Sequence, residues 1–246
     1  MSIPNAKLQT PRSGSRKPET ASRRPEVGSL SLFPLLLLIA MGMFAYAPFM
    51  ILNAPYEATM GLVQKIFYFH VGAAIAMFVA AFTCGIASAI FLFGRRPGAD
   101  RVAFAAAEIT VMLGLIVLIS GPLWARKAWG VWWQWDARLT STLVMWLVFQ
   151  SYLLLRRFGG PGSEKLSAAV GLFGSALVPF VYWSVNLWRT VHPTTNVVPT
   201  LAPSMRGPFL WCVLAFLFLF VLLMTLRVEL EKRRTRLDDL YLALED

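Results

Sequence analysis

Long apolar stretches dominate the chain, and polar residues gather in the short segments between them. Crossing the roughly 30 Å hydrocarbon core of a bilayer takes about 17–25 predominantly apolar helical residues. Six stretches meet this requirement, at residues 30–52, 66–93, 102–123, 139–155, 166–188 and 208–226. The pattern therefore predicts an all-α integral membrane protein with six transmembrane helices.

The polar segments divide the chain into three regions. Residues 1–29 are rich in proline and basic residues, which is typical of a disordered tail. Residues 30–228 form the predicted six-helix membrane domain, and residues 229–246 form a C-terminal tail that ends in a short exposed helix. The first apolar stretch follows a long polar tail and lacks a small-residue cleavage site, so we interpret it as a membrane helix rather than a signal peptide.

The distribution of charge predicts the orientation in the membrane. The chain is 57% hydrophobic and 15% charged, whereas soluble domains are about 45–50% apolar and 25% charged. Most of the 23 lysine and arginine residues lie in the two tails and in the second and fourth connections between spans. By the positive-inside rule, both termini are cytoplasmic and the other three connections lie at the outer face. The same rule accounts for the net charge of +10, so membrane lipid rather than nucleic acid is the expected partner.

The third connection contains a tryptophan-rich segment, residues 124–138, with the sequence WARKAWGVWWQWDAR. Tryptophan is common at membrane interfaces, so these rings could form an anchoring belt. Five of the nine tryptophans in one connection exceed what anchoring requires, and a planar apolar ligand is the alternative. If the segment is helical, one face carries residues at spacings i, i+3, i+4 and i+7, namely Trp129, Trp132, Trp133 and Asp136, while Trp124 and Trp135 point elsewhere.

The two histidines of the chain, His70 and His192, are predicted to lie at the outer face on different spans. A single interfacial histidine is often a hydrogen-bonded structural residue, whereas a pair on one face suggests metal ligation by neutral imidazoles. Two ligands make a poor zinc site, which needs three or four. A haem iron needs only two axial ligands, because the macrocycle supplies the other four nitrogens.

Two basic residues are candidates for pairing with the haem propionates. Lys65 precedes His70 by five residues, and Arg138 occupies the first turn of the fourth span, where the helix dipole disfavours a cation. Snorkelling to the interface is the alternative for both. Asp136 is either an N-cap of that span or part of the ligand site.

Further predictions concern an acidic residue, a tryptophan and the two cysteines. Glu108, in the third span, has no partner recognisable in the sequence. Trp188 and His192 share a face if the fifth helix extends that far. The cysteines, Cys84 and Cys212, lie inside apolar stretches and are expected to be small buried residues rather than a disulfide or a metal pair.

Three sequence segments resemble the membrane proteins that handle haem during cytochrome c maturation. Residues 129–140, WGVWWQWDARLT, resemble the tryptophan-rich signature, and residues 65–71, KIFYFHV, and 182–193, YWSVNLWRTVHP, resemble the segments around the two histidines. Six spans and two histidines resemble the short members, the haem exporter protein C (CcmC) family. The resemblance covers roughly residues 32–226. Gly72 departs from the pattern, because a proline is expected there.

The resemblance implies a ligand, a site and partners. It implies a non-covalent haem b on the outer face with His70 and His192 as axial ligands. It also implies an aromatic shelf made of Trp129, Trp132, Trp133, Trp135 and Asp136. The implied partners are a periplasmic haem chaperone (CcmE-like), a small single-span helper (CcmD-like) and ABC transporter subunits (CcmA/CcmB-like), all in a bacterial inner membrane.

We therefore expect a haem-handling protein rather than an enzyme, with Lys65 and Arg138 meeting the propionates. One alternative is a b-type electron-transfer cytochrome, although such proteins commonly hold their histidines deeper in the bundle. The other alternative is a transporter of a different solute, although neither an internal repeat nor a cluster of charges at the midplane is apparent.

Overall fold

The computed structural model describes residues 32–194 and 197–245, and within them the chain is helical apart from short connections. The elements are α1 (Phe33–Asn53), the 3-10 turn η1 (Leu62–Lys65), α2 (Ile66–Gly94), α3 (Pro97–Ala128), α4 (Ala137–Phe158), α5 (Ser163–Leu187) and α6 (Pro203–Glu245). Each of the six α-helices is long and apolar enough to cross a membrane, which confirms the predicted all-helical class and the six helices of membrane-spanning length. The predicted disordered tail, residues 1–29, lies outside the described residues.

Two helices extend well beyond the apolar stretches that predicted them. α3 begins at Pro97, a residue type favoured in the first turn, and continues to Ala128. α6 runs for 43 residues, about 65 Å at 1.5 Å per residue, which is roughly twice the thickness of the hydrocarbon core. Its polar part is supported by ion pairs one helical turn apart, Arg227–Glu231 and Glu229–Arg233. The helix predicted for the C-terminal tail is therefore a continuation of α6.

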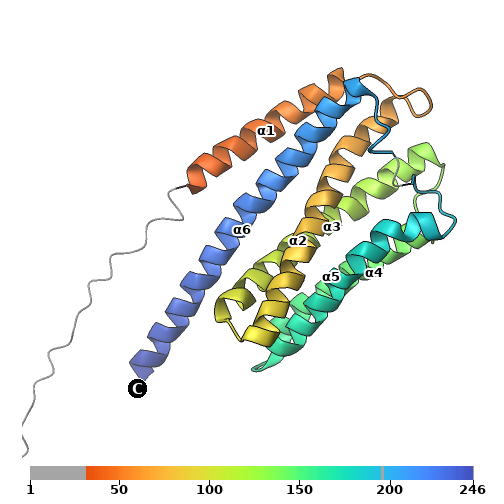
Figure 1. The fold of residues 1–246 in the computed structure, drawn as a ribbon. Helices are drawn as coiled ribbons and strands as arrows, with labels where there is room; N and C mark the ends of the chain where they lie inside the picture. Colours follow the sequence, from red (N-terminus) through yellow and green to blue (C-terminus); the bar gives the residue numbers. More distant parts are fainter. Residues whose placement is uncertain (1–31, 195–196, 246) are drawn as a thin grey trace, which may run out of the picture.

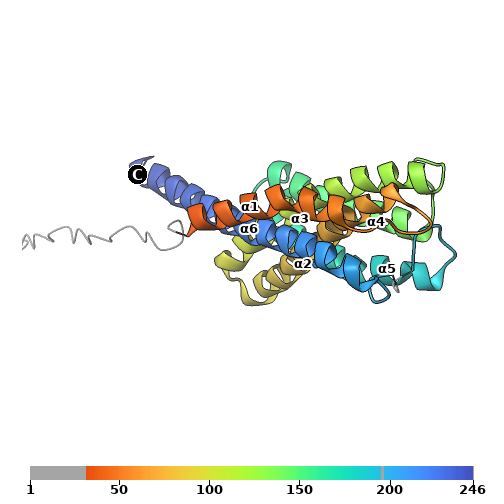
Figure 2. The ribbon, with the colours of Figure 1, turned by 90° about the horizontal axis from the view of Figure 1, so that it is seen from above.

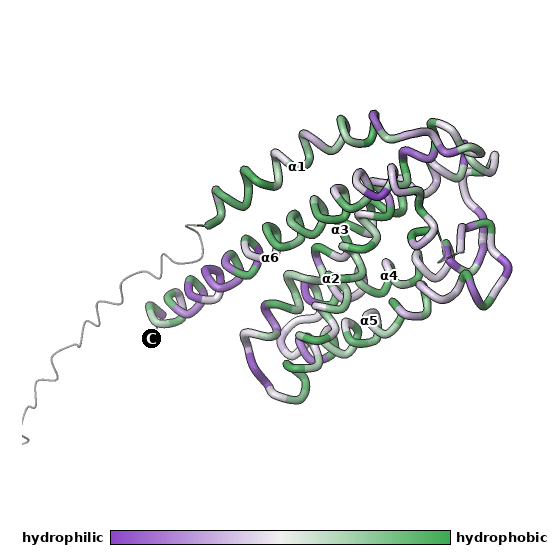
Figure 3. The backbone as a smooth tube through the Cα atoms, turned by 45° about the horizontal axis from the view of Figure 1, so that its top comes forward, coloured by the Kyte–Doolittle hydropathy of each residue, from purple (hydrophilic) through white to green (hydrophobic). Residues whose placement is uncertain are grey.

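The helices form an elongated bundle in which α2 packs against α3, α5 and α6 (Figure 1). α1 lies along α6, and α4 lies along α5 (Figures 1 and 2). The connections 54–65 and 129–136 and the described residues 188–194 and 197–202 all lie at one end of the bundle, at the upper right of Figure 1, which we call the site end. Hydrophilic residues gather at these connections and along the C-terminal half of α6 (Figure 3).

Small residues allow the central helices to approach closely, as is common between membrane helices. The interface of α2 and α3 contains fully buried alanines, among them Ala76, Ala80 and Ala106. At Gly72, an added Cβ would lie 2.9 Å from Phe216 Cδ2 and 3.2 Å from the Cys212 carbonyl oxygen. Glycine in place of the expected proline therefore lets α6 pack directly against α2, two residues after His70. Both cysteines are free and buried, as predicted.

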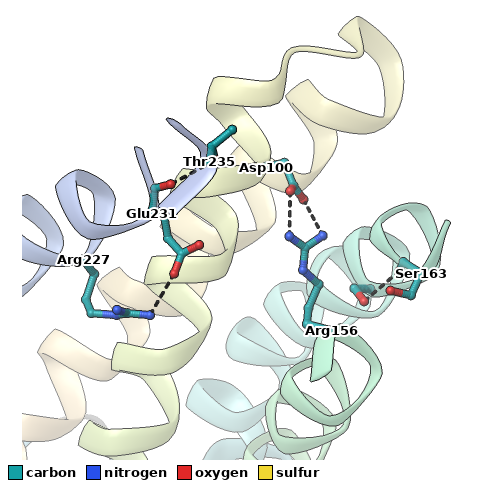
Figure 4. Close-up of polar contacts among 7 residues, drawn as sticks. Asp100, Arg156, Ser163, Arg227, Glu231 and Thr235 are labelled. Carbon is teal, nitrogen blue, oxygen red and sulfur yellow. Dashed lines mark hydrogen bonds and ion pairs between the residues drawn. The ribbon is translucent and has the colours of Figure 1, made fainter. Parts of the chain in front are cut away.

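Ion pairs join the helices at the end opposite the site end. Arg156 of α4 donates two hydrogen bonds to Asp100 of α3, at 3.1 and 2.8 Å (Figure 4). Arg227 of α6 contacts Glu231 at 3.2 Å and donates from Nε to Glu108 at 2.6 Å. Glu108 therefore has a partner, contrary to the expectation from the sequence. That partner is 119 residues away along the chain, so no local pattern could reveal it.

Replacing Gly114 of α3 by alanine should destabilise the bundle. An added Cβ would lie 2.5 Å from Cδ1 of Trp146, whose indole Nε1 donates to the Val111 carbonyl at 2.9 Å. Overpacking of this kind costs about 1–3 kcal/mol. We expect Gly114→Ala to lower the thermal unfolding temperature of the detergent-solubilised protein, measured by tryptophan fluorescence.

The matched control is Gly42→Ala in α1, where no atom lies within 4 Å of the added Cβ. Because alanine is the better helix former, this variant should match or exceed the wild-type unfolding temperature. Equal losses in both variants would show that the contact between α3 and α4 does not depend on a glycine at this position.

Candidate functional site

A cavity at the site end is lined by residues from several elements that are distant in sequence. Apolar side chains from α2, α3 and α5 form much of its wall. Its polar and aromatic lining residues are His70, Phe78, Trp124, Trp129, Trp133, Arg138, Thr142 and His192. The structure therefore brings both histidines to one cavity, together with two of the predicted shelf tryptophans and one of the two predicted basic residues.

His70 lies in the second turn of α2, and its imidazole is held in one tautomer. Its Nδ1 lies 2.9 Å from the Ser120 hydroxyl oxygen on α3. The Ser120 hydroxyl donates its own proton to the Ile116 carbonyl at 2.7 Å, so it accepts from the Nδ1–H of His70. Nε2 of His70 is consequently left with a lone pair, which is the form that ligates metals.

His192 is held in the same tautomer as His70, by a different hydrogen bond. Its Nδ1 lies 2.9 Å from the Pro193 carbonyl oxygen, which can only accept, so Nδ1 carries the proton and Nε2 keeps its lone pair. Burial, followed by the nearby positive charge of Arg138, lowers the pKa of His192 to about 4. The imidazole is therefore neutral at pH 7.

Trp124 contacts both histidines. Its ring centroid lies 6.0 Å from that of His70 and 6.5 Å from that of His192. Trp129 packs on the same ring at 6.1 Å and on His192 at 6.4 Å. Trp124 was not predicted to contact the histidines, because residues 124–138 were assigned to one segment separate from the third span. α3 in fact continues through Trp124, and this helix buries the indole in the bundle.

The predicted helical face of the tryptophan-rich segment does not form, because the segment is irregular from Trp129 to Asp136. Gly130 adopts a positive φ of 78°, a conformation that side chains other than glycine rarely take, and it interrupts the helix. Trp129 and Trp133 line the cavity, whereas Trp132 and Trp135 are 58% and 75% exposed and do not line it. The guanidinium of Arg126 lies over the Trp132 ring and donates to the Gly130 carbonyl.

The charged residues predicted for the site also differ in whether they line the cavity. Arg138 lines the cavity and donates to the Tyr182 carbonyl at 2.5 Å. Lys65 does not line it, and its ammonium donates to the Leu52 carbonyl at 2.6 Å. Asp136 is the N-cap of α4, because its Oδ1 accepts from the Leu139 N–H at 2.8 Å.

The fifth helix ends before His192. Trp188 follows α5 in an extended conformation and packs against Phe180, with ring centroids 5.6 Å apart. It therefore does not share a helix face with His192. Because His192 lies in an irregular connection rather than in a helix, the contacts of that connection determine the position of its imidazole.

The donor set of the cavity fits a flat metal complex that carries acidic groups. Among the described residues, no group of three or more His, Cys, Asp or Glu could hold a metal ion by itself. Two imidazole lone pairs and aromatic walls are present instead. Three buried N–H groups without an acceptor belong to residues that line the cavity, namely Trp124 Nε1, Trp133 Nε1 and Arg138 Nε. A ligand with carboxylate oxygens would satisfy such donors.

The cavity volume is about 80 Å³, well below the roughly 300–1,000 Å³ of pockets for drug-sized ligands and cofactors. Three of its lining residues, Trp129, Trp133 and His192, belong to irregular connections rather than to helices. The chemistry of the cavity therefore fits a macrocycle, whereas its volume in this structure is smaller than one needs.

Comparison with known proteins identifies similar sequences over most of the chain. A model of the family described as "Heme exporter protein C" matches residues 21–241. "Heme exporter protein C" of Bradyrhizobium diazoefficiens is 36% identical over 209 residues, covering 81% of this chain and 77% of that protein. The proteins of the same name from Escherichia coli K12 and Paracoccus denitrificans are 31% and 32% identical. They cover 77% and 74% of this chain, and 80% and 79% of their own lengths.

The tautomer of His70 can be tested directly, because the chain contains only two histidines. In protein labelled with ¹⁵N-histidine, we expect both rings to show a protonated Nδ1 and an unprotonated Nε2 at pH 7. Ser120→Ala removes the acceptor for His70 and should shift the His70 ring signals while leaving those of His192 in place.

Ser167→Ala is the matched control, since Ser167 is also buried and donates to a carbonyl one turn earlier, at the opposite end of the bundle. It should leave both rings unchanged. A spectrum with Nε2 protonated on His70 in the wild-type protein would contradict the hydrogen-bond assignment.

Proposed function

Because this chain belongs to the heme exporter protein C family, whose members handle haem in cytochrome c maturation, we propose that it binds haem b at the site end and presents it for transfer to a periplasmic haem chaperone. The observation that carries the proposal is the convergence of His70 and His192 on one cavity, each with Nδ1 engaged and Nε2 left as a lone pair. In this role the chain binds and releases a ligand and is not an enzyme.

His70 and His192 are the proposed axial ligands of the iron. They come from α2 and from the connection after α5, and both line the same cavity. Bound haem supplies an iron centre with two open axial positions, which is what two neutral imidazoles can fill. The low pKa of His192 favours the neutral form needed for ligation at pH 7.

The aromatic and basic residues have separate proposed roles. Trp129 and Trp133 cover the apolar part of the ring, with Trp124 beneath them, since all three line the cavity. Trp132 and Trp135 are exposed and extend this shelf toward the outer edge of the ring. Arg138 meets a propionate from inside the cavity. Lys65 is proposed to meet the other propionate; it donates to the Leu52 carbonyl and does not line the cavity.

The proposed orientation places the site end at the periplasmic face of a bacterial inner membrane. Most basic residues outside the spans lie in the tails and in the two connections at the opposite end of the bundle, and the three relatives named above are bacterial proteins. A site bounded by irregular connections at the membrane surface suits transfer, because a partner can reach the haem edge there. The partners would be the haem chaperone, a single-span helper and the ABC transporter subunits.

Removing either histidine should weaken haem binding. Changes to residues that merely orient a metal ligand lower affinity about 10–100-fold, so loss of a ligand in His70→Ala or His192→Ala should cost at least as much. The absorption spectrum of the purified protein should lose its low-spin bis-histidine form. In His192→Gly, added imidazole should restore that form by occupying the vacated position. Variants that retain the wild-type spectrum and affinity would refute the ligand assignment.

Trp133→Ala should reduce haem loading without reducing the amount of protein in the membrane. Trp133 lines the cavity, so its loss removes part of the apolar cover of the ring. The control is Trp183→Ala, because Trp183 is 57% exposed on α5 and does not line the cavity. Haem per protein, measured by pyridine haemochrome, should fall only in the first variant. Equal losses of membrane-inserted protein in both would favour anchoring as the role of these tryptophans.

A further inference from the structure

We propose that Thr190 is the positioning residue for His192, acting with Asp136 as a clamp that joins the His192 connection to the start of α4. The inference rests on the proposed function insofar as His192 is an iron ligand. It assigns Thr190 a role that the sequence did not indicate. It also changes the expected role of Asp136 from contact with the haem to support of its ligand.

The Thr190 hydroxyl is engaged on both sides. It donates to the Asp136 carboxylate through Oδ2, and its oxygen accepts from the backbone N–H of His192 at 3.0 Å. The other carboxylate oxygen, Oδ1, accepts from the Leu139 N–H at 2.8 Å. A continuous set of hydrogen bonds therefore runs from the first turn of α4 through Asp136 and Thr190 to the backbone of His192.

This clamp adds a hydrogen-bonded link to the bundle to the ring contacts that Trp124 and Trp129 make with His192. α5 ends at Leu187, so His192 is not carried on a helix. The hydrogen bond from its ring to Pro193 joins adjacent residues, which fixes the tautomer but not the position relative to the bundle. The bond between Thr190 and Asp136 spans 54 residues and does fix that position. His70 has comparable support, since its bond to Ser120 joins α2 to α3.

Asp136 is placed to serve this clamp rather than to touch a ligand. Both of its carboxylate oxygens already accept hydrogen bonds. It does not line the cavity that contains the histidines, and it borders a separate outer groove together with Trp135 and Arg189. An ionised acceptor makes the bond from the Thr190 hydroxyl stronger than one between neutral groups.

The test compares Thr190→Val, Thr190→Ser and Thr194→Val in the full-length protein loaded with haem. Valine keeps the shape of threonine but removes the hydroxyl, whereas serine retains it. Thr194 is exposed in the same connection, two residues beyond His192, so Thr194→Val is the matched control. Thr190→Val should release haem about tenfold faster to apomyoglobin, which corresponds to the loss of one charge-assisted hydrogen bond. Thr190→Ser and Thr194→Val should behave as wild type.

A second readout needs no haem. In ¹⁵N-histidine-labelled protein, Thr190→Val should shift the backbone amide of His192 and speed its hydrogen exchange, while the signals of His70 remain in place. Asp136→Ala should have the same effect on His192. The double variant should be no worse for haem release than Asp136→Ala alone, because the two residues act through one chain of bonds.

The outcomes separate the clamp from the proposed function. If His192→Ala loses the bis-histidine spectrum while Thr190→Val matches Thr194→Val in haem release and in the His192 amide signal, the clamp is refuted and the haem site stands. If His192→Ala keeps the wild-type spectrum, the proposed ligand role fails, and the amide signal still decides whether Thr190 positions His192.

Discussion

The meeting of two imidazoles around one buried indole is the constraint on which the rest of this structure depends. His70 and His192 are separated by most of the bundle in sequence, and Trp124 contacts both. Such a meeting requires α2, α3 and the connection after α5 to converge at one end. The close contact of α2 with α3 follows from buried alanines, and the contact of α2 with α6 follows from Gly72. The packing of small residues along the bundle therefore determines whether the histidines can share a ligand.

The sequence predicted the helices well because hydropathy over about 20 residues is a strong signal, and a helix satisfies its own backbone in a bilayer. The positions at which the helices end were predicted less well. α6 continues past its apolar stretch because its polar residues pair one turn apart, and hydropathy does not measure such pairing. The partner of Glu108 was not predictable for a related reason, since Arg227 lies on a helix that only the folded bundle brings alongside.

Within the site, the sequence identified residue types more reliably than their geometry. The two histidines and Arg138 were chosen for their chemistry, and the structure brings all three to one cavity. The tryptophans were assigned to a helix face, and that assumption failed because Gly130 and the capping residue Asp136 hold the segment in an irregular conformation. Trp124 and Thr190 were missed because their contacts with His70 and Asp136, respectively, join segments far apart in the chain.

The double engagement of Asp136 constrains how the cavity can enlarge. One carboxylate oxygen belongs to the start of α4 and the other holds the connection that carries His192. Through these two bonds, Asp136 links the start of α4 to the connection that carries His192. A widening that keeps these hydrogen bonds would move the two parts together. His192 would then move with the start of α4, whereas His70 would stay joined to α3 through Ser120.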